Sequence, residues 1–260
     1  MLDAYDITVS LGRTQILHGL GFRAQAGQLS AIVGPNGSGK TTLLRAITGD
    51  VPFGGSVTLN DADTRALKPW ELAAIRGVLP QSAVLAFPFT VIEVVRLGLQ
   101  KGLSAAETDI PMAALERVSL AHYADRFFQE LSGGEQQRVH LARVLAQVWQ
   151  PVQDGVPHWL LLDEPVASLD IANQLEVMEI ARGYANAGGG VVAVMHDLNL
   201  TAMFADHVAI LSGGRCLAAG HPKQVMTDAI LSKAYGCKLQ VNTPPHTDTT
   251  FVLPHTAQRL

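Results

Sequence analysis

The chain has 260 residues, of which 48% are hydrophobic and 16% are charged, so one large domain can bury a substantial core. The net charge of −4, from 23 acidic and 19 basic residues, argues against a nucleic-acid partner, and the two cysteines form no C-x-x-C pair that would indicate a zinc site or a disulfide framework. The first residues lack the basic and apolar regions of a secretory signal, and no apolar run reaches the ~18–20 residues that span a bilayer, so we expect neither secretion nor a membrane span.

Short strands are predicted for the first 33 residues. Loosely alternating apolar residues over 4–10 and 20–24, punctuated by glycines, indicate two strands of a small β layer. The run 29–33 is short, apolar and partly β-branched, which is typical of a buried strand. This strand leads directly into the most informative stretch of the sequence.

A phosphate-binding loop follows the buried strand. It fits the pattern G-x-x-x-x-G-K-[S/T] with the sequence Gly34-Pro35-Asn36-Gly37-Ser38-Gly39-Lys40-Thr41, and a helix is predicted over 42–47. Glycines allow successive N–H groups to point at one anion, and a helix N-terminus also favours negative charge. We therefore expect residues 34–42, including Thr42, to hold a nucleotide, with Lys40 on the outer phosphates and the Thr41 hydroxyl on magnesium. The alternative, an ordinary glycine-rich loop, is disfavoured by the full eight-residue match.

The region from 52 to 148 changes from strands to helices. A helix is predicted over 69–75, between strands over 56–60 and 77–80, and the second strand ends at Gln81. Helical periodicity then dominates three segments, 90–98, 104–119 and 132–148. We predict that about 88–148 is a helical insertion and not a continuation of the sheet.

The last helix of this insertion begins with the sequence Leu131-Ser132-Gly133-Gly134-Glu135. Ser132 is a good N-cap, and Glu135 stands three residues later, as in a capping box. Gly133 and Gly134 leave the helix N-terminus bare, so that a phosphate can approach it closely. On these residues alone, a capping box without a ligand is the better interpretation.

Two carboxylates, Asp163 and Glu164, follow an apolar strand predicted over 159–162. Ligands of open α/β sheets gather at the carboxyl ends of the strands, which is where these side chains stand. We expect Asp163 to hold magnesium, through water, and Glu164 to act as general base on the attacking water. An Asp-Glu pair alone is more simply a solvated strand end, but the phosphate loop reverses that preference.

The remaining elements continue the alternation of helices and strands. A helix is predicted over 171–186, a strand over 191–195, and a hairpin of two strands over 208–211 and 215–219. The tail 241–260 is expected to form a short hairpin with mobile last residues.

Together, these motifs resemble the ATP-binding-cassette (ABC) family over essentially the whole chain. The sequence L-S-G-G-[Q/E], here 131–135, is the signature of that family, and other phosphate-loop NTPases lack it. The resemblance implies an α/β fold of the P-loop NTPase type in a single domain, 1–260. That domain would contain a RecA-like core, an antiparallel β subdomain, the helical subdomain at about 88–148 and the tail 241–260. ATP and Mg²⁺ are the cofactors that the resemblance implies.

The resemblance also implies roles for further residues. Gln81 is similar to the Q-loop glutamine, which senses magnesium and contacts the transport subunits, the less favoured alternative being a surface loop residue. His196 is similar to the switch histidine that contacts the γ-phosphate, the alternative being a hydrogen-bonded histidine at a strand end. Asp170 ends the sequence Ser168-Leu169-Asp170, similar to the loop that reaches across the dimer interface. In the family, the signature covers the γ-phosphate of the opposite subunit.

Three positions depart from the pattern of the family. Leu11 stands near the position of an aromatic residue that usually stacks on adenine, and Tyr5 lies too early to replace it. Val166 stands where threonine is common, and the signature ends in Glu135 instead of glutamine. None of these departures removes an expected ligand of phosphate or magnesium.

Two stretches point to one branch of the family. The segment 87–95, Phe-Pro-Phe-Thr-Val-Ile-Glu-Val-Val, is similar to importers of the iron-chelate and cobalamin type. The segment 145–149, followed by a lengthened loop to Trp159, is similar to haem-importer ATPase subunits, unless that loop is a neutral insertion.

The resemblance therefore implies an ATP-hydrolysing subunit that drives haem uptake from the cytoplasmic face of a bacterial inner membrane. Its implied partners are a second copy of the chain, two transmembrane permease subunits and, through them, a periplasmic haem-binding protein. The alternative cargoes are an iron siderophore and cobalamin, and an exporter cassette remains open. A non-transport ABC ATPase is disfavoured, because the chain has neither a second phosphate loop nor a long coiled-coil insertion.

Overall fold

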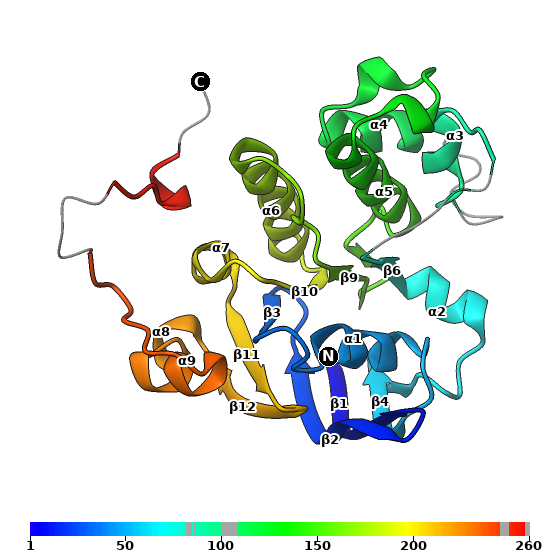
Figure 1. Cartoon of the computed structure of the whole chain (residues 1–260). Helices are drawn as coiled ribbons and strands as arrows, with labels where there is room; N and C mark the ends of the chain where they lie inside the picture. The colour runs from blue at the N-terminus through cyan, green and yellow to red at the C-terminus, as the bar shows by residue number, and fades with distance from the viewer. Residues whose placement is uncertain (82–84, 86, 100–108, 245–249, 258–260) are drawn as a thin grey trace.

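A six-stranded sheet organises the computed structural model, which describes residues 1–81, 85, 87–99, 109–244 and 250–257 (Figure 1). The strand order is β12-β11-β3-β10-β9-β6, and all neighbours are parallel except the antiparallel pair β11 and β12. The strands are β3 (Leu29–Val33), β6 (Arg76–Leu79), β9 (Trp159–Asp163), β10 (Gly190–Val194), β11 (His207–Ser212) and β12 (Arg215–Gly220). The α/β class expected from the sequence is therefore confirmed.

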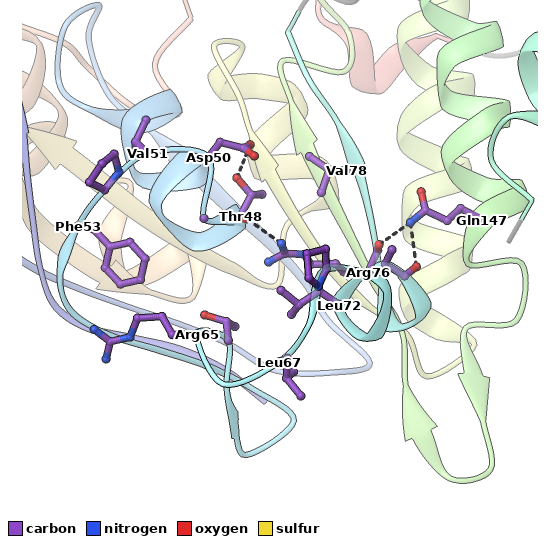
Figure 2. Close-up of a pocket in the computed structure, with 15 residues that line it drawn as sticks. Thr48, Asp50, Val51, Phe53, Arg65, Leu67, Leu72, Arg76, Val78 and Gln147 are labelled. Carbon is purple, nitrogen blue, oxygen red and sulfur yellow. Dashed lines mark hydrogen bonds between the residues drawn. The ribbon is translucent and has the colours of Figure 1, made fainter.

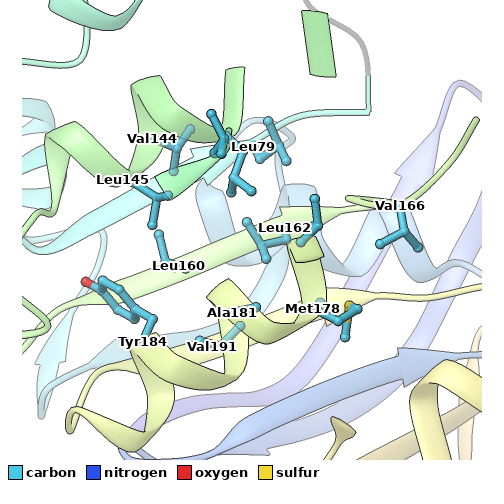
Figure 3. Packing of buried hydrophobic residues seen from close by; sticks show 14 of the residues in the cluster. Leu79, Val144, Leu145, Leu160, Leu162, Val166, Met178, Ala181, Tyr184 and Val191 are labelled. Atoms are coloured by element: carbon cyan, nitrogen blue, oxygen red, sulfur yellow. The ribbon is translucent and has the colours of Figure 1, made fainter. Parts of the chain in front are cut away.

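The three central strands owe their position to their composition. Every residue of β3, β9 and β10 is buried, as expected for parallel strands covered on both faces. Successive side chains of these strands point to opposite faces, so each strand contributes to two cores. On one face, Leu160, Leu162 and Val191 pack with residues of α5 and α6 (Figure 3). On the other face, Leu161 and Val192 pack with α1 and the second sheet.

The second sheet is antiparallel and has the order β2-β1-β4-β5. Its strands are β1 (Leu2–Leu11), β2 (Thr14–Ala24), β4 (Gly54–Leu59) and β5 (Ala62–Asp63). The prediction for β2 was too short, because its first half is largely exposed and carries no continuous apolar signal. A separate two-stranded hairpin consists of β7 (Val152–Gln153) and β8 (Val156–Pro157), so the lengthened loop before β9 has a structure that the sequence did not indicate.

Helices cover both faces of the main sheet. They are α1 (Lys40–Thr48), α2 (Pro69–Ile75), α3 (Val91–Arg96), α4 (Ile110–Arg117), α5 (Gly133–Gln147), α6 (Ile171–Asn186), α7 (Leu198–Phe204), α8 (Pro222–Val225) and α9 (Asp228–Tyr235), with 3₁₀ turns at Ala121–Tyr123, Phe128–Glu130 and Pro254–Thr256. Figure 1 shows α3, α4 and α5 grouped beside the sheet and α1 on the side of the antiparallel sheet. Of these described helices, none has both the length and the apolar composition needed to cross a bilayer.

Most predicted elements are confirmed, and the errors lie in short or peripheral segments. The predicted helix over 104–119 is observed as α4, while its residues 104–108 lie outside the described part of the chain. Helices α7, α8 and α9 were not predicted. The hairpin expected in the tail is wrong for the described residues, where Pro254–Thr256 forms a 3₁₀ turn and no strand is present.

The helical group joins the sheet at its edge strand, β6. A Cβ atom on Gly77 would lie 2.7 Å from Val144 Cγ1 and 3.0 Å from the Val144 carbonyl oxygen, so α5 approaches β6 at a residue without a side chain. Gln147 Nε2, at the end of α5, donates to the carbonyl oxygens of Ala73 and Arg76, at 2.8 and 3.0 Å (Figure 2). The far end of the signature helix is thus fixed to the start of β6.

Candidate active site

The phosphate loop connects β3 to α1 in a conformation that depends on glycine. Gly34 has a φ of +152°, and a Cβ atom there would lie 2.2 Å from the Leu211 carbonyl oxygen. Gly39 is the N-cap of α1 in the left-handed region, with a φ of +99°. The residues of the loop therefore adopt the strand, loop and helix context that the sequence predicted, with the N-terminus of α1 available to an anion.

Lys40 lies at this N-terminus and its side chain folds back onto the loop. Its Nζ donates to the carbonyl oxygens of Gly34 and Pro35, at 2.8 and 3.1 Å. Only 6% of the residue is exposed. Burial lowers the pKa of Lys40, while the nearby carboxylates of Glu164 and Asp163 oppose that shift by favouring the charged form. A buried cation held over a glycine loop is suited to bind a phosphate.

Thr41 and Asp163 are joined by a hydrogen bond. Thr41 Oγ1 donates to Asp163 Oδ1 at 3.1 Å, which brings the loop and the end of β9 together across 122 residues of sequence. Asp163 is 4% exposed, and burial raises its pKa, although the Thr41 hydrogen bond opposes that shift. A buried carboxylate with few compensating partners is a place where a cation would relieve the cost of desolvation.

A cavity of about 340 Å³ lies against this pair. Gln81, just beyond the end of β6, lines it together with Thr41 and Asp163, so the three residues expected to act on magnesium lie around one space. Oxygen donors of this kind suit Mg²⁺, which uses one or two carboxylates and the phosphates of its substrate. Among the described residues, no three His, Cys, Asp or Glu side chains gather into a metal site, so a Mg²⁺ ion here would depend on this donor set and on the nucleotide.

Glu164 has an unusual backbone conformation and a close side-chain partner. Its φ is +53°, in the left-handed region that residues with a Cβ atom rarely adopt. Its amide donates to the Val194 carbonyl oxygen at 3.2 Å, which ties it to the end of β10. Its Oε1 lies 2.6 Å from His196 Nε2. Since an ionised carboxylate only accepts, Nε2 carries the proton in this contact.

The signature residues form the capping box that the sequence predicted. Ser132 is the N-cap of α5, and its Oγ accepts from the Glu135 amide at 3.4 Å. Glu135 Oε2 accepts in return from the Ser132 hydroxyl at 2.7 Å and from the Ser132 amide at 2.8 Å, and these two hydrogen bonds to the carboxylate lower the pKa of Glu135. A Cβ atom on Gly133 would meet nothing within 4 Å, so the helix N-terminus is open. These residues do not line the cavity beside Thr41, so a single copy leaves the signature outside that space.

Two further predicted residues have local roles in the structure. Asp170 is the N-cap of α6, and its Oδ1 accepts from the Asn173 amide at 2.9 Å. Leu11, at the end of β1, is 48% exposed, and Tyr5 is 68% exposed on the same strand. The end of β1 therefore presents an exposed aliphatic side chain near the position where the family usually has an aromatic residue.

A second cavity, of about 860 Å³, lies beside the C-terminal end of α1 and shares Thr48, Asp50 and Val78 with the first (Figure 2). It is lined by residues of α2, the β4–β5 region and the C-terminal end of α1, including Phe53, Leu72 and Arg76. Arg76 donates to the carbonyl oxygens of Ile47 and Thr48, at 3.1 and 2.7 Å. Neither Arg76 nor Gln147 was singled out from the sequence, because their bonds join segments far apart in the chain.

Comparisons with known proteins agree with this geometry. The sequence pattern of the family described as "ABC transporter" matches residues 17–167. The chain is 78% identical to a hemin import ATP-binding protein, HmuV, of Roseobacter denitrificans, over 100% of this chain and 99% of that one. It is 65% identical to a protein of the same name from a Jannaschia species, over 100% of this chain and 96% of that one.

Solved structures show the same fold. An ATP-binding subunit of an ABC transporter superposes with a TM-score of 0.75 at 22% identity, covering 86% of this chain and 91% of that one. A bacterial Atm1-family ABC exporter with ATP bound gives a TM-score of 0.74 at 26% identity, covering 86% of this chain and 39% of that one. The phosphate loop, the paired carboxylates and the capped signature helix thus occur together in a chain that matches the family pattern over more than half its length. The chain belongs to the ABC transporter family.

Proposed function

We propose that this chain is the ATP-hydrolysing subunit of an importer, and that its cargo is haem. The observation that carries the ATPase proposal is the meeting of Lys40, Thr41, Asp163 and the Glu164–His196 pair at the carboxyl ends of β3, β9 and β10. The haem proposal is supported by full-length relatives named as hemin import ATP-binding proteins, together with the similarity of the segments 87–95 and 145–159 to importers.

In the proposed mechanism, the loop amides and Lys40 bind the β- and γ-phosphates of ATP. Thr41 and Asp163 would hold Mg²⁺, with Gln81 beside them, and the ion would supply charge neutralisation to the phosphates. Glu164 removes a proton from the water whose oxygen bonds to the γ-phosphorus, while the bond to the ADP oxygen breaks. His196 orients the Glu164 carboxylate through its Nε2–H and lies at the end of β10, where it can also reach the γ-phosphate.

The ATPase proposal is tested with the purified chain. MgATP should be hydrolysed, and hydrolysis should stop when EDTA removes the metal. Lys40→Ala should abolish hydrolysis, because the outer phosphates lose their point charge, while Lys223→Ala, a change at an exposed lysine outside the site, should retain it. Equal hydrolysis by the wild-type chain and Lys40→Ala would reject this site.

We also propose that the working unit is a dimer in which the signature of one copy completes the site of the other. The open N-terminus of α5 and the absence of the signature residues from the lining of the Thr41 cavity support this arrangement. Ser132→Arg and Lys40→Ala subunits should each be inactive alone, whereas a mixture should recover activity through one intact composite site. Full activity of Ser132→Arg by itself would show that each copy works alone.

Transporters of this family work with membrane-spanning permease partners, and we propose that the chain sits on the cytoplasmic face of the inner membrane through such a partner. The proposed docking segment begins at Gln81 and ends at Phe89, although residues 82–84 and 86 lie outside the described part of the chain. Phe87 supports the proposal, because 68% of its large apolar side chain is exposed. Phe87→Asp should reduce co-purification with the permease without lowering the Tm of the isolated subunit.

The cargo is tested in a bacterium whose copy of this gene is deleted. The wild-type gene should restore growth on haem as the iron source, and Lys40→Ala should not. Restoration of growth on a ferric siderophore, or of cobalamin uptake, in place of haem would transfer the proposal to the alternative cargo. In this proposal, a periplasmic haem-binding protein would supply haem to the permease.

A further inference from the structure

The backbone of Glu164 is held by three hydrogen bonds, and one of them comes from a side chain. The Glu164 amide donates to Val194, and the Glu164 carbonyl oxygen accepts from the Ala167 amide at 3.2 Å. The same oxygen accepts from Gln137 Nε2 at 3.3 Å. Because Glu164 has a φ of +53°, a conformation that costs free energy for a residue with a Cβ atom, contacts that fix its peptide groups are needed to maintain it.

Gln137 lies in the second turn of α5, on the same face as the signature glycines. Residues three and four apart on a helix are neighbours, which places Gln137 beside Gly133 and Gly134. A Cβ atom on Gly134 would lie 3.0 Å from Leu169 Cδ2, so the start of α5 packs directly against the loop that follows Glu164. The hydrogen bond from Gln137 therefore lies within a contact between the signature helix and the segment 164–169 of the same chain.

The side-chain amide of Gln137 takes no part in capping the helix. Ser132 and Glu135 form the capping box by themselves. A methionine at this position would have similar length and no donor, and a glutamate would direct an acceptor at the Glu164 carbonyl oxygen. The donor, and not the shape of the side chain, is what the Glu164 peptide uses.

We propose that Gln137 is a positioning residue for Glu164. It fixes the Glu164 carbonyl and holds the left-handed conformation that directs the carboxylate to His196. Through this contact it transmits the position of the signature turn to that carboxylate. The proposal rests on the proposed role of Glu164 as general base. It adds a contact within one chain between the signature helix and the residue that activates water.

The first test compares the kinetics of Gln137→Met with those of Gln147→Met. Gln147 is the same residue type on the same helix, and it also donates to backbone carbonyls, but at the end of α5 remote from Glu164. Gln137→Met should lower kcat by about fivefold to tenfold, the effect of one net hydrogen bond, with the KM for ATP within about twofold. Gln147→Met should keep kcat within about twofold of the wild-type value, even if it lowers the Tm by as much as Gln137→Met does.

A double-mutant cycle separates positioning from a general loss of stability. In a Glu164→Gln background the carboxylate is already removed, so Gln137→Met should cause no further loss of kcat. The result that would overturn the proposal is an equal fractional loss of kcat in both backgrounds, or an equal loss from Gln147→Met.

A second measurement does not depend on catalysis. Hydrogen exchange at the amides of Ala167 and Leu169 should be about tenfold faster in Gln137→Met than in the wild-type chain, and unchanged in Gln147→Met. Unchanged exchange in Gln137→Met would reject the proposal. If the wild-type chain failed to hydrolyse ATP while Gln137→Met still accelerated exchange, the assignment of Glu164 as a base would fail and the structural tie from Gln137 would stand.

Discussion

Glu164 shows how much of the chemistry depends on the conformation of one residue. Glu164 directly follows strand β9, and its φ of +53° turns the chain out of the sheet. His196 Nε2 lies 2.6 Å from its carboxylate. A residue held in a rarely populated conformation at the end of a buried strand is typical of functional sites.

Glu164→Gln should therefore keep ATP binding and slow turnover by ~10²-fold or more, the scale expected when a general base is lost. The measurement is a single-turnover rate with a parallel determination of the Kd for ATP. Glu179→Gln, at an exposed position of α6, is the control and should leave both quantities unchanged. Near-normal hydrolysis by Glu164→Gln would remove Glu164 from the mechanism.

Asp163 should destabilise the fold while serving the site. Burial raises its pKa, so the folded state disfavours the ionised form at neutral pH and gains stability relative to the unfolded state as the carboxyl is protonated. Asp163→Asn should raise the Tm at pH 7 by ~2–4 °C, the shift that about 1 kcal/mol gives in a domain of this size. The gain should vanish below pH ~4, where the wild-type carboxyl is protonated in both states. A lower Tm for Asp163→Asn at pH 7 would contradict this account.

Leu11 provides a test of base recognition. Its exposed aliphatic side chain lies near the position where the family usually has a stacking aromatic residue. Leu11→Tyr should tighten ATP binding by up to about tenfold, because a stacked ring pair contributes ~0.5–1.5 kcal/mol beyond area burial. GTP should compete well with ATP in the wild-type protein. Strong rejection of GTP by the wild-type protein would show that another residue reads the base.

The residues of the site were mostly predictable, because each stands in a short pattern with a chemical reason. Lys40, Thr41, Asp163 and Glu164 are all placed by motif and strand-end position, and the structure brings Thr41 and Asp163 together. Gln137 was not predicted to act at the site. Its hydrogen bond depends on how α5 packs against the segment after β9, and no local pattern encodes that packing.

At the scale of elements, the end of α1 is fixed by a half-buried arginine, Arg76. Arg76 donates two hydrogen bonds to the last carbonyls of the helix, where a positive charge also favours the helix dipole. Burial lowers the pKa of Arg76, with the Asp50 carboxylate opposing the shift, but a guanidinium remains charged at physiological pH.

Arg76→Met should lower the free energy of unfolding by about 2–4 kcal/mol, because two helix carbonyls lose charged donors. Arg76→Lys, which keeps a charge and one donor group, should lose less. Arg65→Met is the control: Arg65 pairs with Asp63 at the surface, with 53% of its side chain exposed, and such pairs contribute little. Urea denaturation of the three variants measures the differences, and equal losses for Arg76→Met and Arg65→Met would contradict the role given to the α1 end.

The elements that the sequence predicted well are those with one dominant signal. The buried strands are complete apolar runs, and α5 and α6 are long helices with clear N-caps. The helices α7, α8 and α9 were missed although α2 and α3, which are no longer than α7, were predicted, and each strand of the β7–β8 hairpin has only two residues. The boundaries of the helical subdomain, about 88–148, stay a prediction.

At the scale of the whole molecule, the candidate nucleotide site and the signature lie on different parts of the chain. The phosphate loop and the carboxylates lie at the carboxyl ends of the central strands, and the signature lies on a helical group attached through β6. The sequence predicted this division from its alternation of strands and helices. The motifs of the nucleotide site do not identify the cargo, because in the proposed importer the cargo passes through the permease. ATP hydrolysis would act on transport only through a coupling between distant sites.

The central claim is that ATP hydrolysis by this chain drives haem uptake. The most direct measurement is haem accumulation in liposomes that contain the chain with its permease, with the haem-binding protein and haem supplied on the side of the bilayer opposite this subunit. We predict accumulation that requires MgATP on the side of this subunit and is lost with Lys40→Ala. ATP-independent accumulation, or equal accumulation with Lys40→Ala, would contradict the claim.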